Sequence, residues 1–242
     1  MKTAKVIVII GYALLCLLCF KIGYAGNLPE ERPPTITPME PIFYASWATI
    51  DVADEIAEEK DYKLSDLTII SDKGDKAQMK LYGSLTILDA AKLWDDFFIL
   101  THNTEIRDVD IQIASPGGST YGGFSIIAQI KKAKKDGFKI TAYGTSMVGS
   151  MAIPIFAVCE YRVTYPSTIF MVHPATIQNP AAMTETDMES QAAFHKMTKD
   201  IYVSVLAEYT NLSKEEWLLK IKTDTWFSAK QAKEWGLVDE IR

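Results

Sequence analysis

From residue 77 onward, segments with strand periodicity alternate with segments of helical periodicity, and this alternation constrains the fold more than any other feature of the sequence. Residues 78–82 alternate between polar and apolar like a strand, and residues 86–101 repeat apolar side chains at helical spacing. Further strands are expected at residues 108–114 and 139–143, with a helix at residues 121–135. Strands separated by helices of this length predict βαβ units, and therefore an α/β fold with a parallel sheet.

Residues 143–173 are expected to form a strand, a tight loop, a helix and then a second strand at residues 168–172. Ser150 lies where the loop meets the helix, and His173 ends the second strand. A serine that opens a helix is usually an N-cap, because its side-chain oxygen accepts a hydrogen bond from a free N–H group. A serine and a histidine are also two members of a nucleophilic triad. This stretch alone favours capping over catalysis.

A Ser-Pro-Gly-Gly-Ser turn at residues 115–119 lies one βα unit ahead of Ser150. Adjacent glycines let the backbone approach a ligand closely and adopt conformations that other residues avoid. The free N–H groups of such a turn, and of the helix after it, can hold negative charge. An oxyanion hole needs donors of this kind.

Four blocks of the sequence carry these features. They read IQIASPGGSTYGG at residues 111–123, GSMA at residues 149–152, MVHPA at residues 171–175 and DTWFSAKQAKEWGLVD at residues 224–239. Together and in this order, they resemble the signature blocks of the ClpP-type serine peptidases. The resemblance covers residues 76–242 and implies a ClpP-like peptidase domain. Its fold would be a ClpP/crotonase-like set of repeated βαβ units with a parallel sheet and a long protruding handle-type helix.

The resemblance also implies roles for individual residues. Ser150 matches the nucleophile, His173 the general base and Asp224 the orienting carboxylate, while the backbone N–H groups of Gly118 and Met151 match the oxyanion hole. These roles agree with the chemistry, because an imidazole activates the hydroxyl and a carboxylate fixes the tautomer. The expected reaction is serine-type hydrolysis of peptides or unfolded proteins. Ser146, which is also followed by a methionine, is a second candidate nucleophile.

A long helix is expected at residues 188–209. By resemblance it corresponds to the handle through which ClpP rings pair, so a homo-oligomer, with a ring as one form, is expected. Members of this family usually work beside an ATP-driven unfoldase, and whether this chain has such a partner stays open. Two other functions also stay open: a crotonase-like acyl-CoA enzyme, which also uses two backbone N–H groups as an oxyanion hole, and a non-catalytic ClpP-like scaffold.

No cofactor or metal is expected. The sequence contains no HExxH, CxxC or GxxxxGK[ST] motif, and His102 and His195 have no Cys, Asp or second His at metal-ligand spacing. Cys159 lies in an apolar strip, where a buried hydrophobic residue is the ordinary interpretation. The net charge of −6 argues against nucleic-acid binding, which relies on Lys and Arg to neutralise phosphates.

The N-terminal part is expected to be separate from the peptidase domain. Residues 1–25 combine a basic start, an apolar run at residues 6–20 and small residues at the cleavage spacing, which indicates a signal peptide or a membrane anchor. Residues 26–75 are expected to form a proline-rich linker followed by a region without recognisable chemistry. The expected location is therefore exported, in a bacterial periplasm or secreted, or tethered to a membrane.

Overall fold

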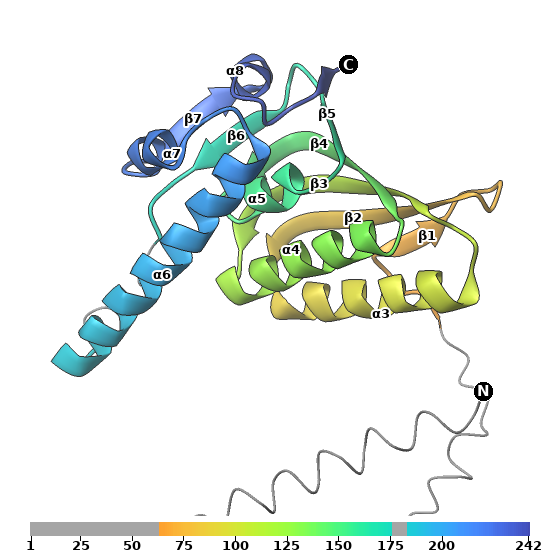
Figure 1. The fold of residues 1–242 in the computed structure, drawn as a ribbon, viewed down its shortest axis with the longest axis horizontal. Coiled ribbons are helices and arrows are strands. Elements are labelled where there is room, and N and C mark those ends of the chain that lie inside the picture. Colours follow the sequence, from red (N-terminus) through yellow and green to blue (C-terminus); the bar gives the residue numbers. More distant parts are fainter. Residues whose placement is uncertain (1–62, 176–182) are drawn as a thin grey trace, which may run out of the picture. The chain divides into compact units, whose positions relative to one another are not determined.

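A sheet of eight strands forms the centre of the part of the chain that the computed structural model describes, which is residues 63–175 and 183–242 (Figure 1). The expected leader at residues 1–25 and the proline-rich segment after it lie outside the described residues. The strands are β1 Thr68–Ile70, β2 Lys76–Leu85, β3 Asp108–Gly118, β4 Lys139–Gly149, β5 Tyr161–Thr164, β6 Ile169–Val172, β7 Thr225–Ser228 and β8 Glu240–Ile241. The helices are α3 Ile87–Asn103, α4 Thr120–Lys135, α5 Ala152–Ala157, α6 Glu185–Tyr209, α7 Lys214–Lys220 and α8 Ala229–Glu234.

The sheet is mainly parallel, as the alternation of strands and helices predicts. Its main path runs β1-β2-β3-β4-β5-β8, and β6 pairs with β4 on one side and with β7 on the other. The pairs from β2 to β5, the pair β5–β8 and the pair β4–β6 are parallel, whereas β1–β2 and β6–β7 are antiparallel. Because β1 belongs to this sheet, the folded domain begins ahead of the expected boundary at residue 76.

One part of the hydrophobic core lies between the sheet and the helices α3 and α4, which run side by side over it (Figure 1). In β3, Val109, Ile111 and Ile113 point into this core and are almost fully buried, while the residues between them are more exposed. Leu93 of α3 and Ile130 of α4 are fully buried against them. Burying one such side chain contributes about 1.5–3 kcal/mol, so this layer fixes the position of β3 and of the turn at its end.

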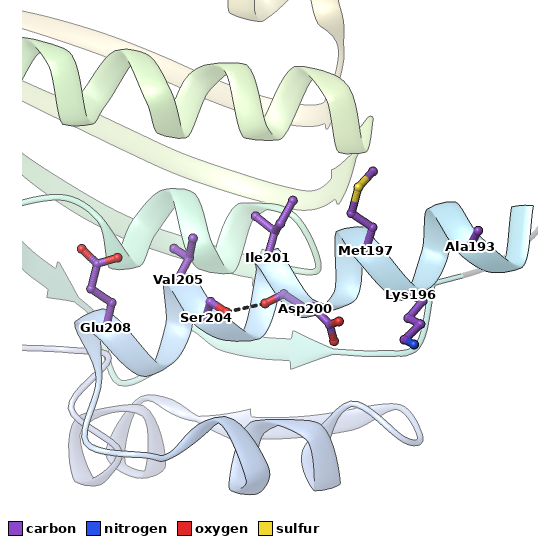
Figure 2. Close-up of a pocket in the computed structure, with 8 residues that line it drawn as sticks. All are labelled: Ala193, Lys196, Met197, Asp200, Ile201, Ser204, Val205 and Glu208. Carbon is purple, nitrogen blue, oxygen red and sulfur yellow. Dashed lines mark hydrogen bonds between the residues drawn. The ribbon is translucent and has the colours of Figure 1, made fainter.

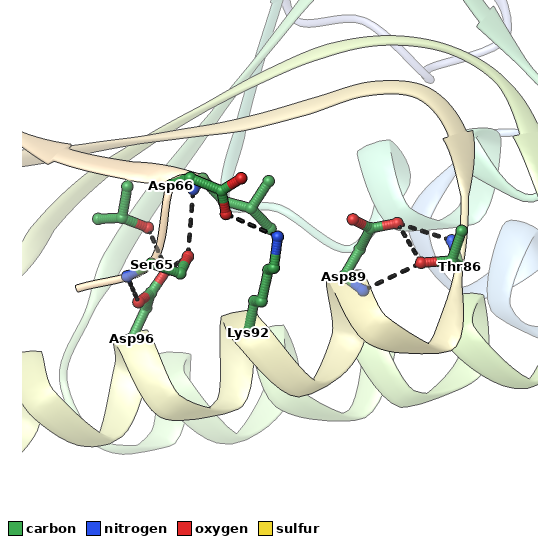
Figure 3. Close-up of polar contacts among 8 residues, drawn as sticks. Ser65, Asp66, Thr86, Asp89, Lys92 and Asp96 are labelled. Atoms are coloured by element: carbon green, nitrogen blue, oxygen red, sulfur yellow. Dashed lines mark hydrogen bonds and ion pairs between the residues drawn. The ribbon is translucent and has the colours of Figure 1, made fainter. Parts of the chain in front are cut away.

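A buried carboxylate attaches the segment before β1 to α3. Asp96 of α3 is fully buried, and it accepts hydrogen bonds from the backbone N–H of Ser65 (2.7 Å) and from the hydroxyl groups of Ser65 (2.7 Å) and Thr68 (2.5 Å). Figure 3 shows this cluster beside an exposed ion pair, in which Lys92 Nζ lies 2.7 Å from an oxygen of Asp66. Three donors on one carboxylate offset the cost of burying its charge.

Helix α6 is 25 residues long, and its N-terminal part extends away from the rest of the domain (Figure 1). Its fully buried residues, Thr198, Val203, Val205 and Leu206, all lie in its C-terminal half. The helix begins with a capping box, in which the side chains of Thr184 and Asp187 each accept a hydrogen bond from the other residue's backbone. The structure thus contains the long helix that was expected at residues 188–209.

Within residues 63–175 and 183–242, no helix has both the length and the apolar character needed to cross a bilayer.

Two local expectations were wrong. Residues 144–149, expected as a loop, continue β4, because β4 pairs first with β5 and then with β6. The Pro-Gly-Gly turn is the last part of β3, which pairs with β2 as far as Gly118. The last strand is β8, and Leu237 and Val238, shortly before it, are buried in the core without pairing.

Candidate active site

Ser150 occupies a strained turn between the end of β4 and the start of α5. Its φ is 49°, in the left-handed region that costs an L-residue roughly 1–2 kcal/mol. Its backbone N–H donates to the carbonyl of Met171 in β6 (2.7 Å), and its carbonyl accepts from the N–H of Ile153 (3.0 Å). Hydrogen bonds on both sides therefore hold the strained conformation, as is common at functional sites.

The side chain of Ser150 contacts His173. The two side chains approach to 2.8 Å between Ser150 Oγ and His173 Nε2. Their proximity follows from the parallel pairing of β4 with β6, in which Gly149 lies opposite Met171, so both strands end at the same edge. The expectation that the Ser150 hydroxyl caps a helix was wrong, because Met151 is the N-cap of α5 and no side chain caps that helix end.

The other candidate serine lies farther along β4 from this contact. Ser146 is exposed and also has a positive φ, of 50°. In the described part of the chain, its side chain has no hydrogen bond to His173. The structure thus brings His173 to Ser150 and not to Ser146.

Asp224 lies immediately before β7, at the same edge. In the antiparallel pair β6–β7, Val172 lies opposite Thr225, so the next opposed positions are those of His173 and Asp224. Asp224 is exposed, and among the described residues no hydrogen bond joins its carboxylate to His173. The backbone therefore brings all three expected residues to one edge, whereas the side chains bring together only Ser150 and His173.

The glycines at the end of β3 lie against the Ser150 turn and against β2. Gly117 and Gly118 have φ values of 101° and 152°, which favour glycine. A Cβ atom added to Gly117 would lie 2.6 Å from the Cβ of Ser150 and 2.9 Å from the backbone N of Met151. One added to Gly118 would lie 2.3 Å from the carbonyl oxygen of Leu85. Only glycines allow this close packing of three backbone segments.

Ser115 holds the bend that precedes these glycines. Its side chain is fully buried, and its hydroxyl donates to the carbonyl of Gly83 (2.6 Å) and accepts from the N–H of Gly117 (3.0 Å). The bend is thereby fixed from both β2 and β3. This arrangement places Gly117, next to Gly118, against the Ser150 turn.

The backbone N–H of Met151 is free to bind a ligand. Met151 is the N-cap of α5, a position whose N–H has no partner within the helix. Among the described residues, no backbone carbonyl accepts from it. It follows Ser150 directly, so a carbonyl group bound at Ser150 Oγ would lie within reach of this donor.

Cys159 and His102 take no part in this arrangement. Burial raises the pKa of the Cys159 thiol from its ordinary value of 9.0 to about 12. His102 lies in the last turn of α3, where Nδ1 is 2.8 Å from the carbonyl oxygen of Phe98. Residues 63–175 and 183–242 hold no group of three or more His, Cys, Asp and Glu side chains placed to share a metal ion.

Comparison with known proteins identifies the family. Residues 63–242 match the family described as Clp protease. The chain belongs to the Clp protease family. The Clp protease match begins ahead of residue 68, in agreement with the position of β1 in the sheet.

Individual Clp proteases are similar to this chain over most of their length. The ATP-dependent Clp protease proteolytic subunit 2 of Corynebacterium diphtheriae is 30% identical over 154 residues, which cover 63% of this chain and 75% of the relative. The proteolytic subunit 1 of Chlamydia abortus is 34% identical over 131 residues, covering 53% and 67%. A ClpP1 mutant from Listeria monocytogenes has a TM-score of 0.60 at 25% identity, covering 68% of this chain and 90% of that one. The expected family and ClpP fold are confirmed, and the chain is a Clp-type peptidase.

One residue at the site was not found by sequence reasoning. Tyr202 of α6 donates a hydrogen bond from its hydroxyl to the carbonyl oxygen of Ser150, at 3.1 Å. Burial raises its pKa well above the usual range, so the hydroxyl keeps its proton at neutral pH. The sequence offers no signal for this contact, because a tyrosine within a partly apolar helix is an ordinary packing residue.

Proposed function

We propose that this chain is a serine peptidase that hydrolyses peptides or unfolded proteins, with Ser150 as nucleophile and His173 as general base. The observation that carries the proposal is the 2.8 Å contact between Ser150 Oγ and His173 Nε2. The free N–H of Met151 beside it supports a role in binding the oxyanion. Membership of the Clp protease family agrees with this chemistry.

The reaction proceeds in two halves. His173 Nε2 takes the proton from Ser150 Oγ as the oxygen attacks the carbonyl carbon of the scissile peptide bond. The carbonyl oxygen becomes negative and receives hydrogen bonds from the N–H groups of Gly118 and Met151, and one such donor stabilises the transition state by roughly 3–4 kcal/mol. His173 then gives its proton to the leaving amine. Water repeats these steps on the acyl-enzyme and restores Ser150.

The proposed role of Asp224 is to orient His173. When Nε2 accepts the serine proton, Nδ1 must carry the other proton of the ring, and a carboxylate is the usual acceptor for that N–H. Asp224 follows in register opposite His173, which supports the role, although the two side chains do not form a hydrogen bond. We propose that substrate binding or assembly brings the Asp224 carboxylate onto Nδ1, since catalytic hydrogen bonds often tighten only in the complex.

A fluorophosphonate probe tests the proposal. The probe should label the purified chain at Ser150, as located by mass spectrometry of the labelled peptide, and Ser150→Ala should abolish both the labelling and the hydrolysis of an unstructured protein such as casein. Ser146→Ala is the matched control and should retain both. Labelling at Ser146 would reassign the nucleophile. A folded wild-type chain that neither reacts with the probe nor hydrolyses casein would favour a non-catalytic scaffold, and retention on an acyl-CoA column would favour the acyl-CoA enzyme.

We also propose that the chain assembles with copies of itself through α6. Met188, Met197 and Ile201 of this helix are exposed to 48%, 57% and 43%. Met197 and Ile201 are among the residues that line an open hollow of about 560 Å³. Figure 2 shows both side chains on the same side of the helix. Exposed apolar side chains of this size are typical of contacts between subunits. Light scattering should give a multiple of the monomer mass that falls for Ile201→Glu, and a monomeric wild type would contradict the proposal.

The proposed location is outside the cytoplasm, either exported or tethered to a membrane. It rests on the basic and apolar pattern of residues 1–25. An exported peptidase has no ready supply of ATP, so we propose that it acts on chains that are already unfolded, without an unfoldase. N-terminal sequencing of the protein from cells should find a mature chain that begins near residue 26. An intact N-terminus in the membrane fraction would indicate an anchor, and one in the cytoplasmic fraction would contradict the proposal.

A further inference from the structure

The carbonyl oxygen of Ser150 is held by two donors from different elements. One is the backbone N–H of Ile153, at 3.0 Å, which belongs to the first turn of α5. The other is the hydroxyl of Tyr202, at 3.1 Å, which comes from α6 and is 52 residues away in the sequence. The first contact is local to the turn. The second attaches the turn to another part of the domain.

This carbonyl shares a rigid unit with the N–H of Met151. A peptide group is planar, so the C=O of one residue and the N–H of the next point in opposite directions when the bond is trans. The described residues contain no cis peptide bond. Fixing the oxygen of Ser150 therefore fixes the direction in which the N–H of Met151 points. Because Ser150 has a strained φ of 49°, the turn is expected to change conformation when one of the two hydrogen bonds to its carbonyl is removed.

We propose that Tyr202 is a positioning residue, which aims the Met151 N–H at the oxyanion by holding the other end of the same peptide group. The inference rests on the proposed function and deepens it. Tyr202 does not touch substrate and acts only through the Ser150–Met151 peptide. The same hydrogen bond polarises that peptide and strengthens its N–H as a donor.

Tyr202→Phe tests the proposal, because it removes one hydroxyl and keeps the ring that packs in the core. We expect kcat for a fluorogenic peptide to fall about threefold to tenfold, the range that a neutral hydrogen bond corresponds to, with KM unchanged, since the oxyanion forms only after binding. Tyr209→Phe, on the same helix, is the matched control and should keep the wild-type kcat.

A pair of inhibitors separates positioning from general loosening of the site. A peptide aldehyde adds to the serine and places an oxyanion in the hole, whereas the corresponding peptide alcohol only occupies the binding site. Tyr202→Phe should weaken binding of the aldehyde by the same factor by which kcat falls, and it should leave binding of the alcohol unchanged. An unchanged kcat, or an equal loss for both inhibitors, would overturn the proposal.

A readout that needs no activity keeps this inference distinct from the proposed function. Amide hydrogen exchange at Ile153, whose N–H donates to the same carbonyl of Ser150, should be faster in Tyr202→Phe than in the wild type and unchanged in Tyr209→Phe, because the peptide group that carries this acceptor is free to turn. If the wild type is inactive, the proposed function fails, and the exchange rate still decides whether Tyr202 holds this peptide. Unchanged exchange at Ile153 would overturn the inference even in an active enzyme.

Discussion

Gly117 and Ser150 pack so closely that the glycine has no space for a side chain. The serine Cβ lies 2.6 Å from the point where a Cβ of Gly117 would be, well inside the contact distance of two carbon atoms. Gly117 is the penultimate residue of β3 and Ser150 directly follows β4, and these two strands pair in parallel. The position of the Ser150 turn thus depends on the absence of a side chain at Gly117 in the neighbouring strand.

Gly117→Ala is therefore expected to displace Ser150. The methyl group would clash with Ser150, and the φ of 101° would strain the new residue. We expect the rate of fluorophosphonate labelling to fall on the order of a hundredfold, as a misplacement of about 1 Å can cause. Gly137→Ala is the control, because Gly137 has a φ of 93° and nothing within 4 Å of its added Cβ. It should lower stability while keeping the labelling rate, and equal rates in both variants would contradict the steric argument.

Asp96→Ala should destabilise the domain strongly. It leaves three buried or partly buried donors of Ser65 and Thr68 without their acceptor. We expect a loss of about 3 kcal/mol in the free energy of unfolding, measured by urea denaturation. Asp66→Ala removes the neighbouring exposed ion pair with Lys92, which solvent screens, and should change the free energy of unfolding far less. Similar losses for the two variants would mean that the buried network contributes little.

Arg162 and Asp239 are expected to be energetically coupled. Arg162 Nε and Nη2 donate to the two carboxylate oxygens, at 2.8 and 2.7 Å, and Nη1 donates to the carbonyl of Tyr209 at 2.7 Å. Because the Arg162 side chain is only 13% exposed, Arg162→Ala should cost about 3 kcal/mol, and Arg162→Lys most of that, since lysine lacks the fork of donors.

Asp239→Ala in the Arg162→Ala background should add less than it does alone. Strictly additive losses in this double-mutant cycle would show that the two residues act independently.

Cys159 should be unreactive in the folded protein and should make stability depend on high pH. Its pKa rises from 9.0 to about 12, because burial disfavours the thiolate. The unfolded chain thus releases this proton near pH 9, whereas the folded chain keeps it until about pH 12, so the contribution is complete below pH 9 and is lost between these values. Urea midpoints of the wild type should fall more steeply over that window than those of Cys159→Ala. Iodoacetamide should modify Cys159, located by peptide mapping, only after denaturation.

Most of the fold could be predicted from the sequence because long elements repeat their pattern several times. In the 16 residues of α4 the helical pattern repeats over several turns, and in β3 the alternation of buried and more exposed residues repeats several times. Short elements do not repeat their pattern and are harder to predict. β5 has four residues and follows α5 without a clear turn signal, and it was missed.

The site could be predicted only as far as motifs describe it. Ser150, His173 and the glycines of β3 stand in blocks that a family resemblance identifies, and the pairing of β4 with β6 brings the first two together. The contact of Tyr202 depends on how α6 packs on the Ser150 turn, and no local pattern records that distance. The missing bond between His173 and Asp224 depends on side-chain conformations, which spacing does not determine.

The strand β6 also sets the positions of the three candidate residues relative to one another. It lies between β4 and β7, parallel to one and antiparallel to the other, so Ser150 follows the first strand, His173 the second, and Asp224 precedes the third. The spacing of the three residues at this edge is thus set by the hydrogen-bonded pairing of the strands and not by their separation along the chain. Because α6 and α7 lie between His173 and Asp224 in the sequence, the length of that segment does not set the spacing of the two residues, which the pairing of β6 with β7 sets instead.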